Sequence, residues 1–234
     1  KTSDTLDMSR VQLTAYLDDY AYLANALVAL YEATFDERWI DEAMRLVEIM
    51  RKHFADAASG GFFFTANDHE QLIARNKDFL DQSVPSGNAM AALALVRLGK
   101  LTGRADLLDA AESTLQAAVG VIQQAPTAAG QLLIALDLYL GPTYEIAIVG
   151  DVAEPQTQAV VAELRRRFIP NKVIGCRNVS SAGSEYLSAL FEGRSIAATP
   201  PAVYVCRDFT CDAPVHGEAA KAIGQRLAET PAAK

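Results

Sequence analysis

The chain has 234 residues, half of them hydrophobic, and a formal net charge of −8. This hydrophobic content is enough for a folded core, which argues against a mainly disordered chain. The negative charge disfavours nucleic acid and anionic membrane surfaces, and no apolar run approaches the ~20 residues that span a bilayer. We therefore expect neither a nucleic-acid nor a membrane partner. Three cysteines are too few for a disulfide framework, which favours a reducing compartment, so we expect a cytoplasmic protein.

The first strong pattern along the chain is a pair of amphipathic helices. Residues 16–34 place Leu23, Leu27 and Leu30 on one face at helical spacing. A second helix over about 37–54 carries apolar residues at steps of three and four. Adjacent helices with so short a connection are expected to form a helical hairpin.

This hairpin is repeated 68 residues further along the chain. Residues 21–43 aligned with residues 89–111 give nine identities in 23 positions without a gap, and the match continues through the connecting turn. A third helix starts after Pro126 and runs to Leu140. It begins after a proline and ends at a glycine, as does the earlier stretch from Pro85 to Gly99. The repeat predicts a mainly α-helical fold, with helical hairpins over residues 1–141.

Repeated helical hairpins either stack into a solenoid or close into an α/α toroid. We favour the toroid, because the helices at the inner positions are rich in Ala and Leu on more than one face. Closing such a ring takes about a dozen helices, so the five expected here leave it open. The exposed apolar surface should then drive self-association of the chain.

The sequence period changes after residue 141, where strands and helices begin to alternate. Strands are predicted over residues 144–150, 172–177 and 202–206, and helices over 154–168, 183–191 and 216–229. The alternation predicts a small α/β unit over residues 142–234 with a parallel sheet. It contains neither of the glycine-rich phosphate-binding motifs, so no cofactor is expected.

Polar residues gather at the leading ends of the predicted inner helices. Asp18-Asp19-Tyr20 and Ser86-Gly87-Asn88 occupy equivalent repeat positions, so both should face the same mouth of the ring. The long connection between them contains Gly60-Gly61-Phe62-Phe63-Phe64-Thr65 and is expected to form a β-hairpin over that mouth. The candidate catalytic residues are Asp18, Asp19, Asp78 and Asp81, and the candidate substrate-binding residues are Tyr20, Phe63, Arg75, Ser86 and Asn88.

Carboxylates, amides and aromatic faces are the groups that bind sugars, and paired aspartates can act as general acid and base in glycoside hydrolysis. A possible sugar ligand is therefore expected. The same residues also have a structural interpretation, because Asp and Ser before a helix are ordinary caps. His53, His69 and His216 are widely separated, so the two-histidine arrangement of a sugar epimerase is not visible.

The cysteines allow more than one interpretation. Cys206 and Cys211 are separated by four residues, and Cys176 ends a neighbouring predicted strand, so three sulfurs can gather at one sheet edge. A C-x4-C spacing without a second pair is a poor zinc motif, and no metal is expected. Buried free thiols are one alternative, and a Cys206–Cys211 disulfide or redox-responsive pair is the other.

Several segments together resemble the spermatogenesis-associated, thioredoxin domain-containing protein family. They are LDDYAYL (17–23), ALYEATFD (29–36), GGFFFT (60–65), DQSVPSGN (81–88), EIAIVG (145–150) and VCRDFTCDAPV (205–215). The resemblance covers nearly the whole chain and implies a thioredoxin-like domain followed by a six-hairpin glycosidase-like barrel, of which this chain holds the carboxy-terminal part. Since Lys1 is not a methionine, we expect the chain to be part of a longer product.

The resemblance implies a carbohydrate-related fold and redox coupling. A glycosidase- or epimerase-like activity is expected only for the full-length protein, with this piece inactive alone. The rival interpretation is a non-catalytic interaction module whose partner is the missing thioredoxin-like part or another protein.

Overall fold

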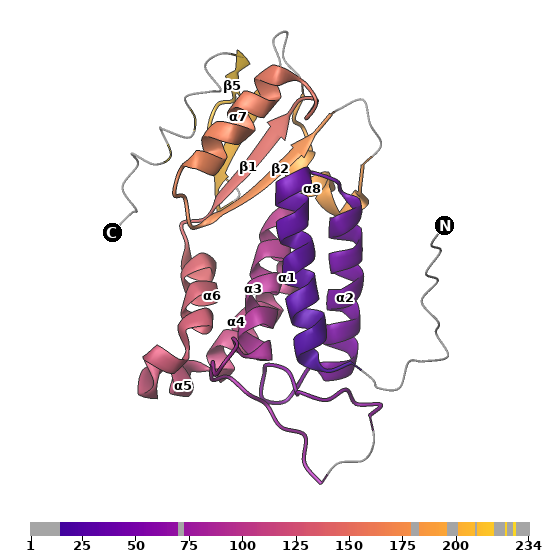
Figure 1. Cartoon of the computed structure of the whole chain (residues 1–234), viewed down its shortest axis with the longest axis vertical. Coiled ribbons are helices and arrows are strands. Elements are labelled where there is room, and N and C mark those ends of the chain that lie inside the picture. The colour runs from indigo at the N-terminus through magenta and orange to yellow at the C-terminus, as the bar shows by residue number, and fades with distance from the viewer. Residues whose placement is uncertain are drawn as a thin grey trace, which may run out of the picture.

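The computed structural model describes residues 15–69, 73–178, 183–195, 201–208 and 210–217, together with residues 223 and 227. Long helices lie side by side at one end of the molecule, and a small sheet partly covered by helix α7 lies at the other (Figure 1). The chain is therefore mainly helical with a small α/β unit, which confirms the predicted fold class. Among the described residues, no helix is both long and apolar enough to cross a bilayer.

The helical part consists of two hairpins and two further helices. Its helices are α1 (Leu17–Thr34), α2 (Arg38–Phe54), α3 (Gly87–Thr102), α4 (Ala105–Ala117), α5 (Val119–Gln124) and α6 (Gly130–Leu140), with a short 3₁₀ turn at Pro126–Ala128. Helix α1 pairs with α2 and α3 pairs with α4, while α3 lies between α1 and α6. The inner row α1, α3, α6 with outer helices α2 and α4 is the order that the repeat predicts.

The two hairpins share details of hydrogen bonding as well as sequence. The hydroxyl groups of Thr34 and Thr102, at equivalent repeat positions, each donate to the carbonyl four residues earlier at 2.7 Å. Each threonine is followed by a residue in the left-handed conformation, Phe35 with φ 57° and Gly103 with φ 69°. The helices therefore end in the same way 68 residues apart, as expected of a true structural repeat.

Small residues let α3 pack closely between its neighbours. The helix is buried along nearly its whole length and contains Ala89, Ala91, Ala92 and Ala94, all fully buried. Gly99 faces the Leu108 side chain of α4, and a Cβ added there would lie 2.7 Å from it. Close approach of this kind explains why the predicted inner helices carry so much alanine.

The second part contains a small sheet. Its elements are β1 (Tyr144–Val149), α7 (Pro155–Arg166), β2 (Lys172–Arg177), a 3₁₀ turn (Glu185–Leu187), α8 (Ser188–Phe191), β3 (Ala202–Arg207), β4 (Thr210–Cys211) and β5 (Val215–His216). The strand order is β2-β1-β3-β4, and β5 also pairs with β3. The last helix was predicted over residues 216–229. Residues 215–216 instead form a strand, whereas residues 223 and 227 are helical.

The sheet is mixed, so the predicted parallel sheet needs correction. Strand β1 runs parallel to β2 but antiparallel to β3. Strand β2 ends at Arg177 opposite Val149, and β3 begins at Ala202, also opposite Val149. The connection thus re-enters the sheet at the end where it left. A parallel return would require a crossover along the length of the sheet, which the four-residue α8 does not supply.

The helices and the sheet share one hydrophobic core. A single cluster of buried side chains includes Tyr31 and Leu98 from the helices and Ile146 and Ile174 from the sheet. An ion pair also crosses this boundary, because the buried Lys100 amine of α3 lies 3.4 Å from the buried Glu145 carboxylate of β1. The same amine lies 2.8 Å from the Asp208 carboxylate, so two acids offset the cost of burying the Lys100 charge.

The described residues of the connection between α2 and α3 are irregular and lack the paired strands of the predicted β-hairpin. An isolated bridge joins Ala55 to Phe62, and the Phe64 N–H donates to the Asn76 carbonyl at 2.8 Å. The expected turn includes residues 70–72, which lie outside the described residues. The segment contacts the leading ends of both α1 and α3. The Leu17 N–H donates to the Phe64 carbonyl at 3.0 Å, and the Phe62 N–H donates to the Asn88 side chain at 2.7 Å.

Candidate functional site

The leading ends of α1 and α3 meet at one end of the helical part. A Cβ added at Gly87 would overlap Asp18 Oδ1, so the two helix starts are in direct contact. The Tyr22 hydroxyl of α1 donates to the carbonyl of Pro85, just before α3, at 2.7 Å. We call the surface around Asp18, Asp19 and Asp78 the helix-end face.

Asp81 has a structural role at this face. Its Oδ1 accepts from the Ser86 N–H at 2.9 Å, at the start of α3. Its Oδ2 accepts from the Gln131 N–H at 2.8 Å, in the first turn of α6. Both carboxylate oxygens therefore bind free N–H groups at helix starts, where a negative charge is stabilising. Ser86 caps α3 through a 3.2 Å bond from the Ala89 N–H.

Asn88 holds the loop against α3. It is 1% exposed, and its Oδ1 accepts from the Phe62 N–H at 2.7 Å. Its Nδ2 donates to the carbonyls of Phe62 and Asp78, both at 2.9 Å. These three bonds use the amide for backbone pairing, so Asn88 positions Asp78.

Arg75 and Phe63 fix the loop from its outer side. The Arg75 guanidinium lies over the Phe63 ring at 4.2 Å and donates to the carbonyls of Thr65 and His53. Tyr20 packs against Phe54 with 5.3 Å between ring centroids. These predicted substrate-binding residues thus have structural partners, as the alternative interpretation expects.

Asp18 differs from the other acids at this face. The Asp19 carboxylate accepts from the Tyr16 N–H at 2.8 Å, and the Asp78 carboxylate accepts from the Leu80 N–H at 3.0 Å. Among the described residues, no hydrogen bond or ion pair engages the half-buried Asp18 carboxyl. Burial raises the pKa of Asp18, and the neighbouring charges of Asp19 and Asp78 raise it further. The same crowding acts on Tyr22, whose pKa is raised first by burial and then by Asp18 and Asp81.

Aromatic surface lies next to these carboxyl groups. The rings of Tyr16 and Phe64 are stacked with centroids 4.7 Å apart, and Phe64 is 37% exposed. Tyr16 is the N-cap residue of α1, two positions before Asp18 and three before Asp19. The sequence interpretation chose Phe63 instead. Phe64 offers the more accessible aromatic surface, because Phe63 is covered by Arg75.

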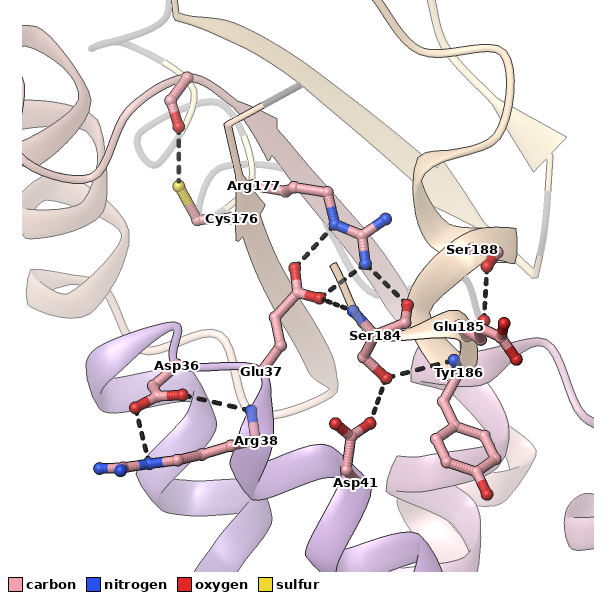
Figure 2. Close-up of polar contacts among 11 residues, drawn as sticks. Asp36, Glu37, Arg38, Asp41, Cys176, Arg177, Ser184, Glu185, Tyr186 and Ser188 are labelled. Atoms are coloured by element: carbon pink, nitrogen blue, oxygen red, sulfur yellow. Dashed lines mark hydrogen bonds and ion pairs between the residues drawn. The ribbon is translucent and has the colours of Figure 1, made fainter. Parts of the chain in front are cut away.

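A polar cavity of about 540 Å³ lies away from the helix-end face, where β1 and β2 end and where the α1–α2 turn approaches them. Figure 2 shows that the Arg177 guanidinium forms two 2.7 Å bonds to the Glu37 carboxylate, and both side chains are mostly buried. The Ser184 hydroxyl donates to Asp41 at 2.5 Å. Ligands of open α/β sheets bind outside the carboxyl ends of their strands, which is the position of this cavity.

This cavity was not predicted from the sequence. The α/β unit contains no glycine-rich phosphate-binding motif, yet Gly150 and Asp151, directly after β1, line the cavity. Burial raises the pKa of the Cys176 thiol at its floor to about 12, and the thiol lies 3.6 Å from the Gly150 carbonyl. Its charged pair, Glu37 and Arg177, is separated by 140 residues and has no local sequence signal.

The cysteines do not form a three-sulfur cluster. Cys206 and Cys211 are joined by a disulfide, the second of the two alternatives that the sequence left open. Cys176 is a buried free thiol opposite Ile148, which in turn lies opposite Val203, three residues before Cys206. No cluster of three or more potential metal ligands occurs in the part of the chain that the structure describes.

Comparison with known proteins shows long matches to one group of sequences. Human spermatogenesis-associated protein 20 is 32% identical over 214 residues, which are 90% of this chain and 27% of the human protein. The rat protein of that name is 33% identical over 171 residues, or 73% of this chain and 22% of its own length. These matches support the spermatogenesis-associated protein 20 family.

An uncharacterized protein of Caenorhabditis elegans is 24% identical over 214 residues, which are 90% of this chain and 28% of that protein. No protein-family profile matches the chain. The chain spans about a quarter of the length of the relatives it matches. These matches agree with the resemblance that the sequence motifs indicate.

Proposed function

We propose that the helix-end face is one part of a carbohydrate site that the rest of a longer protein completes. The observation that carries this proposal is the Asp18 carboxyl, whose pKa is raised and which has no bonded partner among the described residues. A carboxyl group of this kind holds its proton to higher pH than an ordinary aspartate does. It is therefore suited to donate a proton to a leaving oxygen, as a general acid does in glycoside hydrolysis.

The surroundings of Asp18 support a sugar as the ligand. Asp19 and Asp78 are exposed and offer carboxylate oxygens to hydroxyl groups. The partly exposed Phe64 ring, stacked on Tyr16, offers an apolar face of the kind that covers one side of a pyranose. In this proposal Asp81, Ser86, Asn88 and Arg75 position the face, and Asp18 is the catalytic candidate.

The proposal places this chain in a larger helical ring. Helices α1, α3 and α6 would be consecutive inner helices of an α/α toroid of the six-hairpin glycosidase-like kind. Their leading ends would line its mouth, and preceding hairpins would supply the opposite wall. The activity would then be glycosidase- or epimerase-like in the whole protein.

A thermal-shift screen of the full-length protein with mono-, oligosaccharides and sugar nucleotides tests the proposal. We expect at least one sugar to raise the melting temperature of the unmodified protein. The Asp18→Asn variant should lose that increase, while the Asp109→Asn variant, altered at an exposed residue of α4, should keep it. The proposal is wrong if no sugar stabilises the protein, or if both variants respond as the unmodified protein does.

A second candidate function, a docking module for another protein part, is favoured by the outer surface of α1. Leu23 and Leu30 are 49% and 42% exposed, and Ala26 and Ala33 lie exposed between and beyond them at helical spacing. We call these four residues the α1 stripe. A preceding hairpin, a thioredoxin-like domain or a second copy of the chain would bury it. A pull-down with the isolated thioredoxin-like part separates this function from the first, because sugar binding does not require it.

A further inference from the structure

The disulfide between Cys206 and Cys211 joins two unlike positions. The two residues lie directly opposite one another on the antiparallel strands β3 and β4. Cys206 is 1% exposed and belongs to the sheet, whereas Cys211 is exposed on a two-residue edge strand. An incoming thiolate can therefore approach the Cys211 sulfur from solvent but not the Cys206 sulfur.

A cationic side chain touches both sulfurs. The Arg194 Nη2 lies 3.0 Å from Cys206 Sγ and 3.4 Å from Cys211 Sγ. The guanidinium is held in place by a bond from its Nη1 to the Leu190 carbonyl and by the Tyr204 ring, 5.5 Å away. A cavity of about 130 Å³ beside Cys206 is lined by Arg194 and Lys100, among others. Glu145 also lines this cavity, and Lys100 is paired with Glu145 and Asp208, so Arg194 is the cation in contact with the buried sulfur.

We propose that Cys206–Cys211 is a thiol–disulfide exchange site whose substrate is a dithiol of another protein. A thiolate of the dithiol attacks Cys211 Sγ, and the S–S bond breaks. Cys206 leaves with the electron pair as a thiolate that Arg194 stabilises. The second thiol of the partner then attacks the partner's own sulfur in the mixed disulfide and releases Cys211.

The reaction balances as a two-electron exchange. The partner dithiol is oxidised to a disulfide, Cys206 and Cys211 become thiols, and the two protons of the dithiol pass to them or to solvent. Because a leaving thiol departs faster when its pKa is low, the Arg194 contact accelerates the first step. The same contact favours the reduced state at equilibrium, since a thiolate gains from a cation and a disulfide does not.

The fold allows this exchange without loss of the sheet. Strand β3 pairs with β1 along its whole length, and its Val203 and Val205 side chains are buried. Strand β4 pairs with β3 through two residues only. Cys176 provides an internal contrast, because burial raises the pKa of its thiol to about 12, which leaves almost no thiolate at neutral pH.

The site of attack can be mapped on the full chain. The oxidised chain is treated briefly with glutathione, free thiols are alkylated, and the mixed disulfide is located by peptide mass spectrometry. We expect glutathione on Cys211 in both the unmodified chain and the Cys176→Ser control. Glutathione on Cys206, or no mixed disulfide at either cysteine, overturns the proposal.

The role of Arg194 is tested by equilibrium with dithiothreitol buffers of defined redox ratio. The Arg194→Gln variant should have an equilibrium constant for reduction about tenfold lower, which corresponds to about 30 mV. Arg194→Lys, which keeps the charge, should recover most of the difference. Equal constants for the unmodified chain and Arg194→Gln contradict the assigned role. The mapping experiment uses no Arg194 variant, so it remains decisive if these variants fold poorly.

Discussion

The Oδ1 atom of Asp18 occupies the space that a Cβ would fill at Gly87. The two residues belong to the leading turns of α1 and α3 and are 69 positions apart. Glycine at residue 87 therefore lets a carboxyl group fit between two helix ends. This contact creates the partly buried environment that raises the pKa of Asp18.

Replacing Gly87 should disturb this contact directly. Gly87→Ala should lower the free energy of unfolding by about 1–3 kcal/mol, because the new methyl group displaces Asp18. Urea denaturation measures the loss. In the Asp18→Gly background the same substitution should cost less, which a double-mutant cycle would show. Gly120→Ala in α5 is the matched control, since nothing lies within 4 Å of its Cβ, and it should be neutral or stabilising.

The raised pKa of Asp18 predicts a specific pH dependence of stability. The folded chain favours the protonated carboxyl, so this favourable contribution is present at acid pH and is lost as pH rises through the folded-state pKa. Asp18→Asn should therefore be more stable than the unmodified chain at pH 7, and the difference should shrink toward pH 3. Urea denaturation at several pH values measures it.

Asp106 offers a control of opposite sign. Its hydrogen bond with Arg104 holds the pKa of Asp106 well below its usual range. Asp106→Asn should lower stability at pH 7, and that loss should disappear as pH falls below the range where aspartates titrate. If the two variants followed the same pH trend, the assignment of Asp18 as a raised-pKa acid would be wrong.

Asp81 is predicted to matter more for stability than an ordinary cap. Asp81→Ala removes acceptors from the starts of both α3 and α6, and each cap contributes about 1 kcal/mol, so a loss of about 2 kcal/mol is expected. Ser86→Ala removes a single cap and should cost about half as much. Thermal unfolding of both variants provides the comparison, and equal losses would contradict the bridging role.

Removing only one member of the mostly buried ion pair Glu37–Arg177 should strongly lower the free energy of unfolding. Arg177→Met leaves the Glu37 carboxylate without its charged partner and should lower stability by about 3–5 kcal/mol. The double variant Glu37→Met with Arg177→Met should recover most of this loss. A surface pair such as Arg45 and Glu42 serves as the control, because its removal should change stability by less than about 1 kcal/mol.

The α1 stripe predicts self-association of this chain when it is isolated. Sedimentation velocity should show the mean mass rising with concentration, because exposed leucines at helical spacing bury one another. Leu23→Glu with Leu30→Glu should abolish the effect. A compact monomer at all concentrations, in the unmodified chain, would count against any docking role for this surface.

The helices were largely predictable from sequence because their signals are local. The predicted ranges 16–34 and 37–54 lie within one residue of α1 and α2 at each end. The repeat also predicted that α1, α3 and α6 lie in one row, because equivalent helices of a repeat pack against equivalent neighbours. The leucines of α1 were placed on one face, yet Leu27 is buried while Leu23 and Leu30 are exposed.

Sequence could not reveal what depends on distant partners. Asp81 was a candidate acid, but its second oxygen binds an N–H group 50 residues away. The direction of β3 depends on where its connection re-enters the sheet, and both directions fit the same alternation of strands and helices. Asp18 was one of four candidate acids, and only coordinates show that it lacks the hydrogen bonds that Asp19 and Asp78 make.

Carbon-13 NMR titration of the Asp18 side chain measures the pKa of this carboxyl group directly. We expect a titration midpoint above the ordinary aspartate value of about 3.9. A midpoint at or below the ordinary value would show that Asp18 is one more solvated or capping carboxylate, and would remove the basis for a proton-donating site.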